Sequence, residues 1–365
     1  MTGFACQAIS PTQSRPRCSE PPRRPGKGQP TDADPVADAP MVDVTADAIR
    51  SAHGRIPSVF RDSPQFVSEP LSEAIGVAVV VKLETANPIG CFKGRGTWLA
   101  LSELVAAGRV GERLGVVVAS AGNFGQGVAY AGRAMGIPVS VVAATTASPM
   151  KLAAMRRLGA DVRTVGEDFD AARLAAADLA ADSGWQLLVD GEDPWISIGA
   201  GTIALELSNA VVSGDLPALD RFYVPVGNGA LIAGIGTWLR TEAPATRVIG
   251  VQAAGAPAMT LSWRERRPIE TQRADTIADG IAARVPVRAA LELMIEVVDE
   301  MLLVGDDQIV AATHEMSAAV PTAVEPAAGA AWAAVRAAQS HTGVIGVLIT
   351  GGNVTSRGAS GGGAA

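Results

Sequence analysis

Short runs of β-branched residues alternate with longer helical stretches along most of the chain. Parallel strands need connections of a dozen or more residues, usually a helix, so this alternation indicates parallel sheets. A chain of 365 residues is also long for one core, and favours two lobes. We therefore predict an α/β fold with two doubly wound lobes, mostly parallel sheets and a cleft between them. The expected strands lie at residues 114–120, 137–144, 161–166 and 185–190 in the first group, and at 221–227, 247–254 and 345–352 in the second.

The charge and the cysteines exclude several classes of protein. With 37 acidic and 30 basic residues the net charge is -7, so no broad basic field is available for nucleic acid or an anionic membrane. Cys6, Cys18 and Cys91 show no paired spacing, so neither a disulfide framework nor a zinc site is expected. No apolar run looks long enough to span a bilayer. We expect a cytoplasmic protein without nucleic-acid or membrane partners.

The two ends of the chain differ in composition from the rest. Residues 1–40 are rich in Pro, Arg, Ser and Asp without an apolar period, and we expect a disordered leader. The leader has no continuous apolar stretch of the kind found in secretory signals. Met41 begins the first globular-looking segment and is a candidate for the true start. Residues 357–365 are expected to form a flexible tail.

A lone lysine stands in the run NPIGCFKGRG at residues 87–96, directly after a short apolar strand. Lys93 is flanked by Phe92 and Gly94. A partly desolvated lysine amine can form a Schiff base with a carbonyl cofactor. The alternative is an ordinary surface lysine at a helix start, since lysine is rarely buried without a partner.

Two further loops follow expected strands. In PVGNGALIAGI, at residues 225–235, glycines let backbone N–H groups converge at the start of a helix, where a phosphate needs no basic side chain. In SAGNFGQG, at residues 120–127, the turn supplies similar donors. A simple tight turn in the first loop, and a helix cap by Ser120 or Asn123 in the second, are the structural alternatives.

Lysine after a strand, an Asn-Gly loop after a strand and a glycine loop opening a helix, in that order, resemble the fold-type II pyridoxal-phosphate enzymes. The closest pattern is that of the serine/threonine dehydratase family, related to the tryptophan synthase beta chain. The resemblance covers about residues 41–356 and implies pyridoxal 5'-phosphate as cofactor. It also implies a small lobe at residues 115–192, a large lobe at residues 41–114 plus 193–356, and no regulatory C-terminal domain.

The resemblance assigns roles to single residues. Lys93 would hold the cofactor beside Phe92, and Asn123 would hydrogen-bond its ring hydroxyl. Thr350, in the segment TGGN, would face the pyridine nitrogen; a neutral hydroxyl there makes the ring a weaker electron sink, which suits β-elimination. The cofactor phosphate would bind Gly227, Asn228, Gly229, Ala230 and Leu231. The substrate carboxylate would bind Ser120, Ala121, Gly122 and Asn123.

The sequence departs from the family pattern at several positions. Phe124 replaces a histidine, Cys91 replaces a serine, and Asn228 with Ala230 interrupts a run of glycines. Ala121 stands where related racemases carry a serine, which disfavours a two-base racemase.

Other residues near the expected site are given no role in catalysis or metal binding. Gln252 and Ala258 occupy positions where some relatives have acidic metal ligands, so we expect no metal site. Glu325 lies on a family-like segment, but a glutamate before a helix is equally an ordinary dipole-favoured carboxylate. The histidines, His53, His314 and His341, show no metal or triad spacing.

The resemblance therefore implies a lyase of small β-hydroxy amino acids, which converts L-threonine or L-serine to a 2-oxo acid and ammonia. Lys93 would be the catalytic residue and would take the Cα proton. We expect a homo-oligomer, a dimer or tetramer. Two alternatives stay open: a threonine-synthase-like or cysteine-synthase-like replacement enzyme, although those usually have Asp where this chain has Gly94, and a non-catalytic cofactor-binding protein. The amino acid that fills the pocket is not readable from the sequence.

Overall fold

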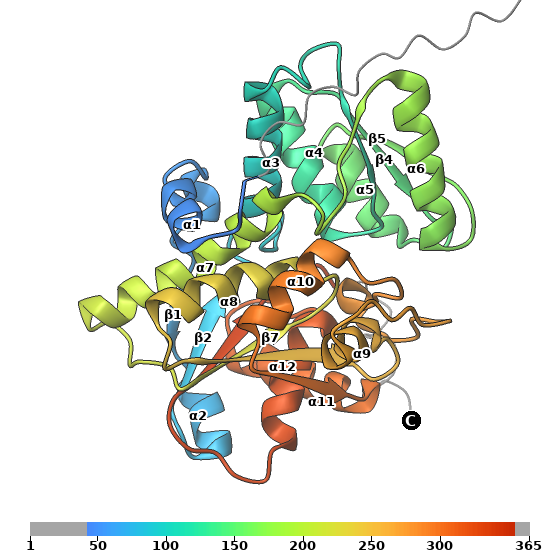
Figure 1. Ribbon diagram of the computed structural model, residues 1–365. Helices are drawn as coiled ribbons and strands as arrows, with labels where there is room; N and C mark the ends of the chain where they lie inside the picture. The colour runs from blue at the N-terminus through green and yellow to red at the C-terminus, as the bar shows by residue number, and fades with distance from the viewer. Residues whose placement is uncertain (1–41, 355–365) are drawn as a thin grey trace, which may run out of the picture. The chain divides into compact units, whose positions relative to one another are not determined.

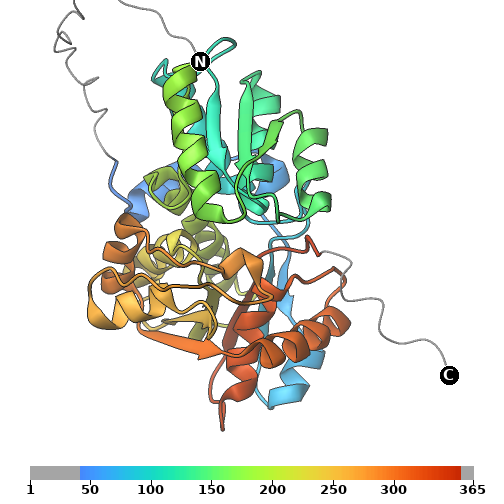
Figure 2. The same ribbon diagram turned by 90° about the vertical axis from the view of Figure 1, so that its right-hand side faces the viewer.

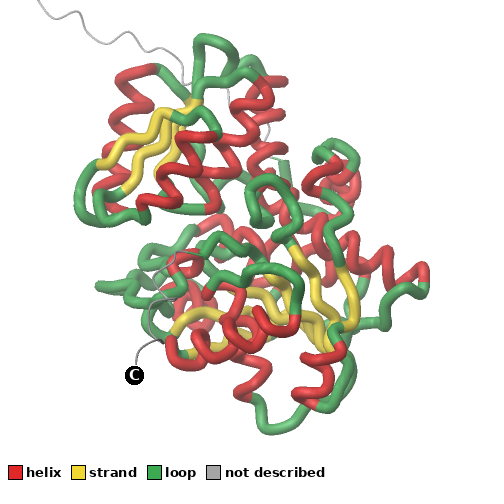
Figure 3. Tube along the Cα trace, turned by 180° about the vertical axis from the view of Figure 1, so that it is seen from behind, coloured by secondary structure: helices red, strands yellow, loops and turns green. Residues whose placement is uncertain are grey.

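The computed structural model describes residues 42–354, whose strands form two separate sheets (Figures 1 and 3). The expected leader, Met41, the expected tail, Cys6 and Cys18 lie outside the described residues. Most strand pairs in both sheets are parallel, so the α/β fold with two sheets is confirmed.

The larger sheet has six strands in the order β1-β2-β10-β7-β8-β9, with only β1 antiparallel to its neighbour. Every residue of β2 and β10 is buried, as expected for central parallel strands covered on both faces. Val80 of β2 packs toward one face, while Val79 and Val81 pack toward the other, against α12. The strands are β1 (Gln65–Val67), β2 (Val79–Leu83), β7 (Arg221–Pro225), β8 (Arg247–Ala253), β9 (Glu300–Val304) and β10 (Ile345–Ile349).

The smaller sheet has four parallel strands in the order β5-β4-β3-β6. Alternate residues of its strands again face opposite sides: Val116 and Val118 pack with α3 and α4, whereas Val117 packs with α6. Its strands are β3 (Val116–Ala119), β4 (Val139–Ala143), β5 (Asp161–Thr164) and β6 (Gln186–Leu187).

Helices cover both faces of each sheet (Figure 2). Those associated with the smaller sheet are α3 (Gly94–Ala106), α4 (Asn123–Met135), α5 (Pro149–Arg157) and α6 (Phe169–Ser183). The others are α1 (Ala46–His53), α2 (Glu69–Ile75), α7 (Pro194–Ser213), α8 (Ala230–Glu242), α9 (Ala258–Glu265), α10 (Arg288–Val297), α11 (Asp306–Ala319) and α12 (Pro326–Ala337), with short 3-10 turns η1 (Ser58–Phe60) and η2 (Asp279–Ile281).

Glycines let α7 approach α3 on one side and α8 on the other. A Cβ placed on Gly199 of α7 would lie 2.5 Å from the Cα of Gly96 in α3. One placed on Gly234 of α8 would lie 1.9 Å from the carbonyl oxygen of Ser197 in α7. Both distances are shorter than any real Cβ contact, so these helix pairs pack backbone to backbone and hold α3 and α8 in fixed positions.

One helix in the described part of the chain, α7, is long and apolar enough to cross a membrane by length and composition, which the sequence analysis did not anticipate. Its most apolar window is 72% buried within the protein. The apolar character of α7 is therefore accounted for by its place in the core, between α3 and α8.

The order of strands in the larger sheet brings distant parts of the sequence together. Neighbouring strands β2, β10 and β7 are each followed by one of the segments singled out from the sequence: Lys93, Thr350 and the loop at Gly227. In open parallel sheets, ligands bind outside the carboxyl ends of the strands. The topology thus gathers these segments at one edge of the sheet.

Candidate active site

Lys93 lies at the start of α3 and is only 13% exposed at its side chain. Its Nζ lies 2.5 Å from Oδ2 of Asp190, which follows β6 of the smaller sheet. The same nitrogen lies over two aromatic rings, 4.9 Å from the ring centre of Phe92 and 5.6 Å from that of Phe124. Ring faces attract cations, so the amine sits between a carboxylate and two favourable ring faces.

Asn123 opens α4 and is held by polar partners on both sides. Its side-chain oxygen accepts a hydrogen bond from Nδ2 of Asn353 at 2.8 Å, and its Nδ2 lies 3.1 Å from both carboxylate oxygens of Glu325. Asn353 also donates to the carbonyl of Ile89, in the lysine run, at 2.8 Å. Asn123 is therefore positioned by groups from two other segments of the chain.

Glu325 is buried, and desolvation raises the pKa of its carboxyl group to about 7, against the lowering effect of the Asn123 hydrogen bond. It precedes α12 but its side chain does not cap that helix. A Cβ on Gly351 would lie 2.4 Å from its Oε1, so the carboxyl group packs against the TGGN backbone. The side chain of Glu325 thus points toward Asn123 and the TGGN backbone. The sequence also allowed an ordinary carboxylate that interacts with the helix dipole, but this side chain does not cap the helix.

Thr350 is buried, and its hydroxyl has no hydrogen-bond partner among the described residues. Its carbonyl accepts a hydrogen bond from the backbone N–H of Phe92 at 3.0 Å. The backbones of Cys91 and Gly351 form an isolated antiparallel β-bridge. The lysine run and the TGGN segment are therefore joined backbone to backbone. Burial also raises the pKa of the Cys91 thiol, which makes it an inert packing group.

The glycine loop leads from β7 into α8. Gly229 has a φ of 98°, in the left-handed region that favours glycine. The side-chain oxygen of Asn228 accepts a hydrogen bond from the N–H of Ala230 at 3.1 Å, and Ala230 and Leu231 are the first buried residues of the helix. Asn228 thus satisfies one of the free N–H groups of the helix start, which a glycine there could not do.

Ser120 follows β3, and its hydroxyl accepts hydrogen bonds from the N–H groups of Gly122 and Gly125, at 3.2 and 2.9 Å. This is the local turn-stabilising role considered from the sequence, and it leaves the hydroxyl proton free to donate. Lys151 lies next to this turn, since a Cβ on Gly122 would be 3.9 Å from its Nζ, and it is ion-paired with Asp279. Ala121 carries no polar side chain.

The structure therefore brings Lys93, Phe92 and Thr350 together, and links Asn123 to the TGGN segment. Three residues of this region, Asp190, Asn353 and Lys151, were not singled out from the sequence. Asp190 carried a usable signal: it stands at the carboxyl end of an expected parallel strand, as Ser120 does. Its partner, Lys93, is 97 residues away in the chain, so the ion pair between the two could not be predicted from the sequence.

The end of β8 and the segment after it have internal partners of their own. Oε1 of Gln252 accepts hydrogen bonds from the N–H and the hydroxyl of Thr260, both at 2.9 Å. Ala258 is buried as the first residue of α9. The acidic ligands that a hard cation prefers are replaced here by an amide that is already engaged and by a methyl group.

A separate buried ion network lies behind the lysine run. Arg95 and Lys82 are fully buried; Arg95 contacts Glu84 at 2.8 Å and Glu206 at 2.6 Å, and Lys82 contacts Glu206 at 2.6 Å. His53 also lies 3.2 Å from Glu206. Paired carboxylates and cations of this kind keep buried charges balanced.

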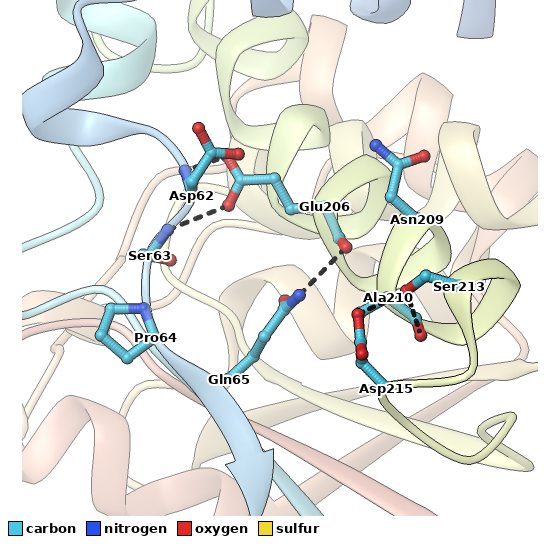
Figure 4. A pocket seen from close by; sticks show the side chains of 9 residues that line it. All are labelled: Asp62, Ser63, Pro64, Gln65, Glu206, Asn209, Ala210, Ser213 and Asp215. Carbon is cyan, nitrogen blue, oxygen red and sulfur yellow. Dashed lines mark hydrogen bonds between the residues drawn. The ribbon is translucent and has the colours of Figure 1, made fainter.

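A pocket of about 440 Å³ opens beside this network, lined by residues that include Asp62, Gln65 and Glu206 (Figure 4). Asp62, His53 and Glu206 lie close enough together to share a cation. However, Glu206 and Glu84 together balance the two cations Arg95 and Lys82, so Glu206 has no surplus charge to offer a metal. None of the pocket's lining residues belongs to the region around Lys93.

A largely shielded amine, a buried hydroxyl without a hydrogen-bond partner in residues 42–354, and a glycine loop at a helix start lie at one sheet edge. Together they define a site for a carbonyl cofactor that carries a ring and a phosphate. Residues 57–351 match the family model of pyridoxal-phosphate dependent enzymes, and the chain belongs to that family. Pyridoxal phosphate fits the residues present. In particular, the hydroxyl of Thr350 is a buried polar atom with no hydrogen-bond partner among the described residues, and a ring nitrogen of the cofactor would supply one.

Within the family, the chain is similar to threonine dehydratases. It is 32% identical over 297 residues to the mitochondrial threonine dehydratase of Schizosaccharomyces pombe, covering 81% of this chain and 48% of that protein. It is 34% identical over 312 residues to the L-threonine ammonia-lyase of Thermotoga maritima, covering 85% and 76%. The chain thus spans about half the length of the first of these relatives and three quarters of the second.

Solved structures agree with this placement. The processed form of threonine deaminase isoform 2 from Solanum lycopersicum matches with a TM-score of 0.75 and 29% identity, over 87% of each chain. A pyridoxal 5'-phosphate-dependent aspartate racemase matches with a TM-score of 0.79 and 28% identity, over 87% of this chain and 98% of that one. The likeness therefore extends to proteins named for two different reactions.

Proposed function

We propose that the protein is an ammonia-lyase, which converts L-threonine or L-serine to a 2-oxo acid and ammonia by β-elimination. The observation that carries the proposal is the position of Lys93, whose amine is hydrogen-bonded to Asp190. The same sheet edge holds the buried hydroxyl of Thr350, which has no partner in the part of the chain that the structure describes. The names of the relatives support the same reaction, because threonine dehydratases and ammonia-lyases recur among them.

In this proposal each segment of the site has one task. Lys93 would hold the cofactor, Phe92 would pack beside it, and Asn123 and Thr350 would bind its ring. The loop that comprises Gly227, Asn228, Gly229, Ala230 and Leu231 would hold its phosphate. When bound, the cofactor supplies an electron-accepting ring that stabilises negative charge at the substrate Cα.

The substrate would be held by the turn after β3. The turn of Ser120, Ala121, Gly122 and Asn123 is suited to a carboxylate, because a strand-to-helix turn presents donors to an anion. The Ser120 hydroxyl would donate to it, whereas the N–H groups of Ser120 and Gly122 already donate to the Val142 carbonyl and to the Ser120 hydroxyl. Nζ of Lys93, once free, would take the Cα proton as a general base. A lyase needs only this one base, which agrees with the apolar side chain of Ala121.

The test is to incubate the purified protein and cofactor with a panel of amino acids, and to follow 2-oxo acid, ammonia and D-amino acid separately. We expect 2-oxo acid and ammonia in equal amounts from threonine or serine, and none from Lys93→Ala. A protein that forms D-amino acid faster than ammonia would be a racemase and would contradict the proposal. Product formed only when a second nucleophile is added would favour the replacement enzymes, and cofactor binding without any product would favour a non-catalytic protein.

Three broader features are also proposals. The division into a small lobe of residues 115–192 and a large lobe of residues 41–114 plus 193–356 is supported by the distribution of the strands between the two sheets. A cytoplasmic location rests on the sequence analysis alone. A homo-oligomer rests on the family resemblance, and light scattering of the purified protein would test it.

A further inference from the structure

Asp190 makes the closest polar contact to the amine of Lys93. The separation of 2.5 Å between Nζ and Oδ2 is that of a short, charge-assisted hydrogen bond. Both side chains are largely shielded from solvent, with 13% and 23% of the lysine and aspartate side chains exposed. Shielding strengthens the attraction between the two charges relative to a surface ion pair.

The backbone fixes the position of Asp190. The residue after it, Gly191, has a φ of 91°, and a Cβ there would lie 3.1 Å from Cγ of Asn228 in the glycine loop. The Asp190 segment is therefore packed against the phosphate-binding candidate on one side and reaches Lys93 on the other. No larger residue fits at Gly191 without strain, so the turn that carries Asp190 requires glycine at this position.

The second carboxylate oxygen of Asp190 is buried and has no hydrogen-bond partner among the described residues. A carboxylate engaged only for structural reasons would normally have both oxygens satisfied, since an unpaired buried acceptor costs about 1–3 kcal/mol. Phe92 and Phe124 surround the same nitrogen with ring faces and offer it no other acceptor. Among the described residues, Asp190 is thus the group that balances the charge of Lys93.

We propose that Asp190 is a positioning residue that acts through Lys93: it fixes Nζ in the site and balances the positive charge that forms when Nζ takes the Cα proton. The Cα–H bond breaks, its electron pair stays on the substrate, and the proton becomes the third hydrogen of an ammonium held by Asp190. This inference rests on the proposed function, which makes the substrate Cα the source of the proton. The ion pair between Lys93 and Asp190 does not depend on that function.

The experiment compares Asp190→Asn with Glu192→Gln, an equivalent loss of a carboxylate at an exposed position two residues away. The first readout uses the protein without cofactor: acetylation of Lys93 by acetic anhydride, followed by peptide mass spectrometry. An ammonium held by a carboxylate reacts slowly, so we expect labelling of Lys93 to accelerate at least threefold in Asp190→Asn and to stay unchanged in Glu192→Gln. Equal rates in all three proteins would overturn the ion pair.

The second readout follows deuterium uptake at Cα of alanine, which has no β-leaving group, by NMR with the cofactor bound. We expect a loss of tenfold or more in Asp190→Asn, with the KM for alanine within threefold, and partial recovery in Asp190→Glu. Uptake as fast as in the wild type would overturn the role of Asp190. If the wild type exchanges the Cα proton but releases no 2-oxo acid from any substrate, the proposed function fails while the inference about Asp190 stands.

Discussion

The side-chain amide nitrogen of Asn123 lies 3.1 Å from both carboxylate oxygens of Glu325. The two residues are 202 positions apart in the chain and meet only because the turn after β3 faces the start of α12. Burial of the carboxyl group opposes ionisation more than this hydrogen bond favours it, so the pKa of Glu325 is raised to about 7.

Glu325→Gln should therefore change how stability depends on pH. Because the folded protein holds a proton that the unfolded chain releases near pH 4.5, the contribution of Glu325 is fully present below that pH and is lost as the pH rises through about 7. The wild-type free energy of unfolding, relative to the glutamine variant, should fall by roughly 3 kcal/mol between pH 4 and pH 8. Urea unfolding of the cofactor-free proteins at several pH values measures this.

Glu192→Gln, at an exposed position, is the control and should show no such difference. If the difference in free energy of unfolding between the wild type and Glu325→Gln stayed constant over the whole pH range, Glu325 would not titrate as described.

Thr350→Val should separate cofactor binding from stability. Valine has nearly the same shape, and it removes a buried hydroxyl that has no partner, so the cofactor-free protein should be equally stable or more stable by about 1 kcal/mol. The Kd for pyridoxal phosphate should rise about fivefold, as expected for one lost hydrogen bond. Thermal unfolding and equilibrium titration provide the two measurements.

The matched control is Thr246→Val, in which a buried threonine loses a real hydrogen bond, 2.7 Å long, to the carbonyl of Leu219. It should lower stability and leave the Kd unchanged, the reverse of the Thr350 result. An unchanged Kd in Thr350→Val would show that its hydroxyl does not reach the cofactor.

Gly234→Ala should be strongly destabilising. The added methyl group would meet the backbone of α7, 1.9 Å from the carbonyl oxygen of Ser197, and neither backbone can yield without moving a helix. We expect a loss of about 3 kcal/mol or more, the upper part of the range for overpacked cores. Gly54→Ala, where a Cβ would meet nothing within 4 Å, should cost little in the same chemical denaturation experiment.

Arg95→Leu should cost about 3–5 kcal/mol, because it leaves Glu84 and Glu206 buried with only Lys82 to balance them. Arg113→Leu, at an exposed position, should stay within about 0.5 kcal/mol of the wild type. If chemical denaturation gave equal stabilities for these two variants, the ion network would contribute nothing to the fold.

The residues that sequence reasoning found are those whose position follows from local pattern. Lys93, Gly227 and Thr350 each follow a strand of the larger sheet, and parallel strands bring their carboxyl ends to one edge. Asn123 follows β3 of the smaller sheet, and its role, like that of Thr350, came from the family resemblance. The partners of these residues could not be found in that way. Asp190 stands at the end of an expected strand and Glu325 lies on a family-like segment, but no local pattern encodes their contacts with residues 97 and 202 positions away along the chain.

Strand β10 has a consequence for how the protein is made. It lies between β2 and β7 and is the last strand of the described chain to leave the ribosome. Until it emerges, β2 and β7 have no common neighbour, so the nascent larger sheet exists as two pieces with exposed strand edges. Such edges are prone to aggregation. Removal of residues 345–354 should therefore abolish soluble expression, and the full chain should depend on chaperones until β10 has left the ribosome.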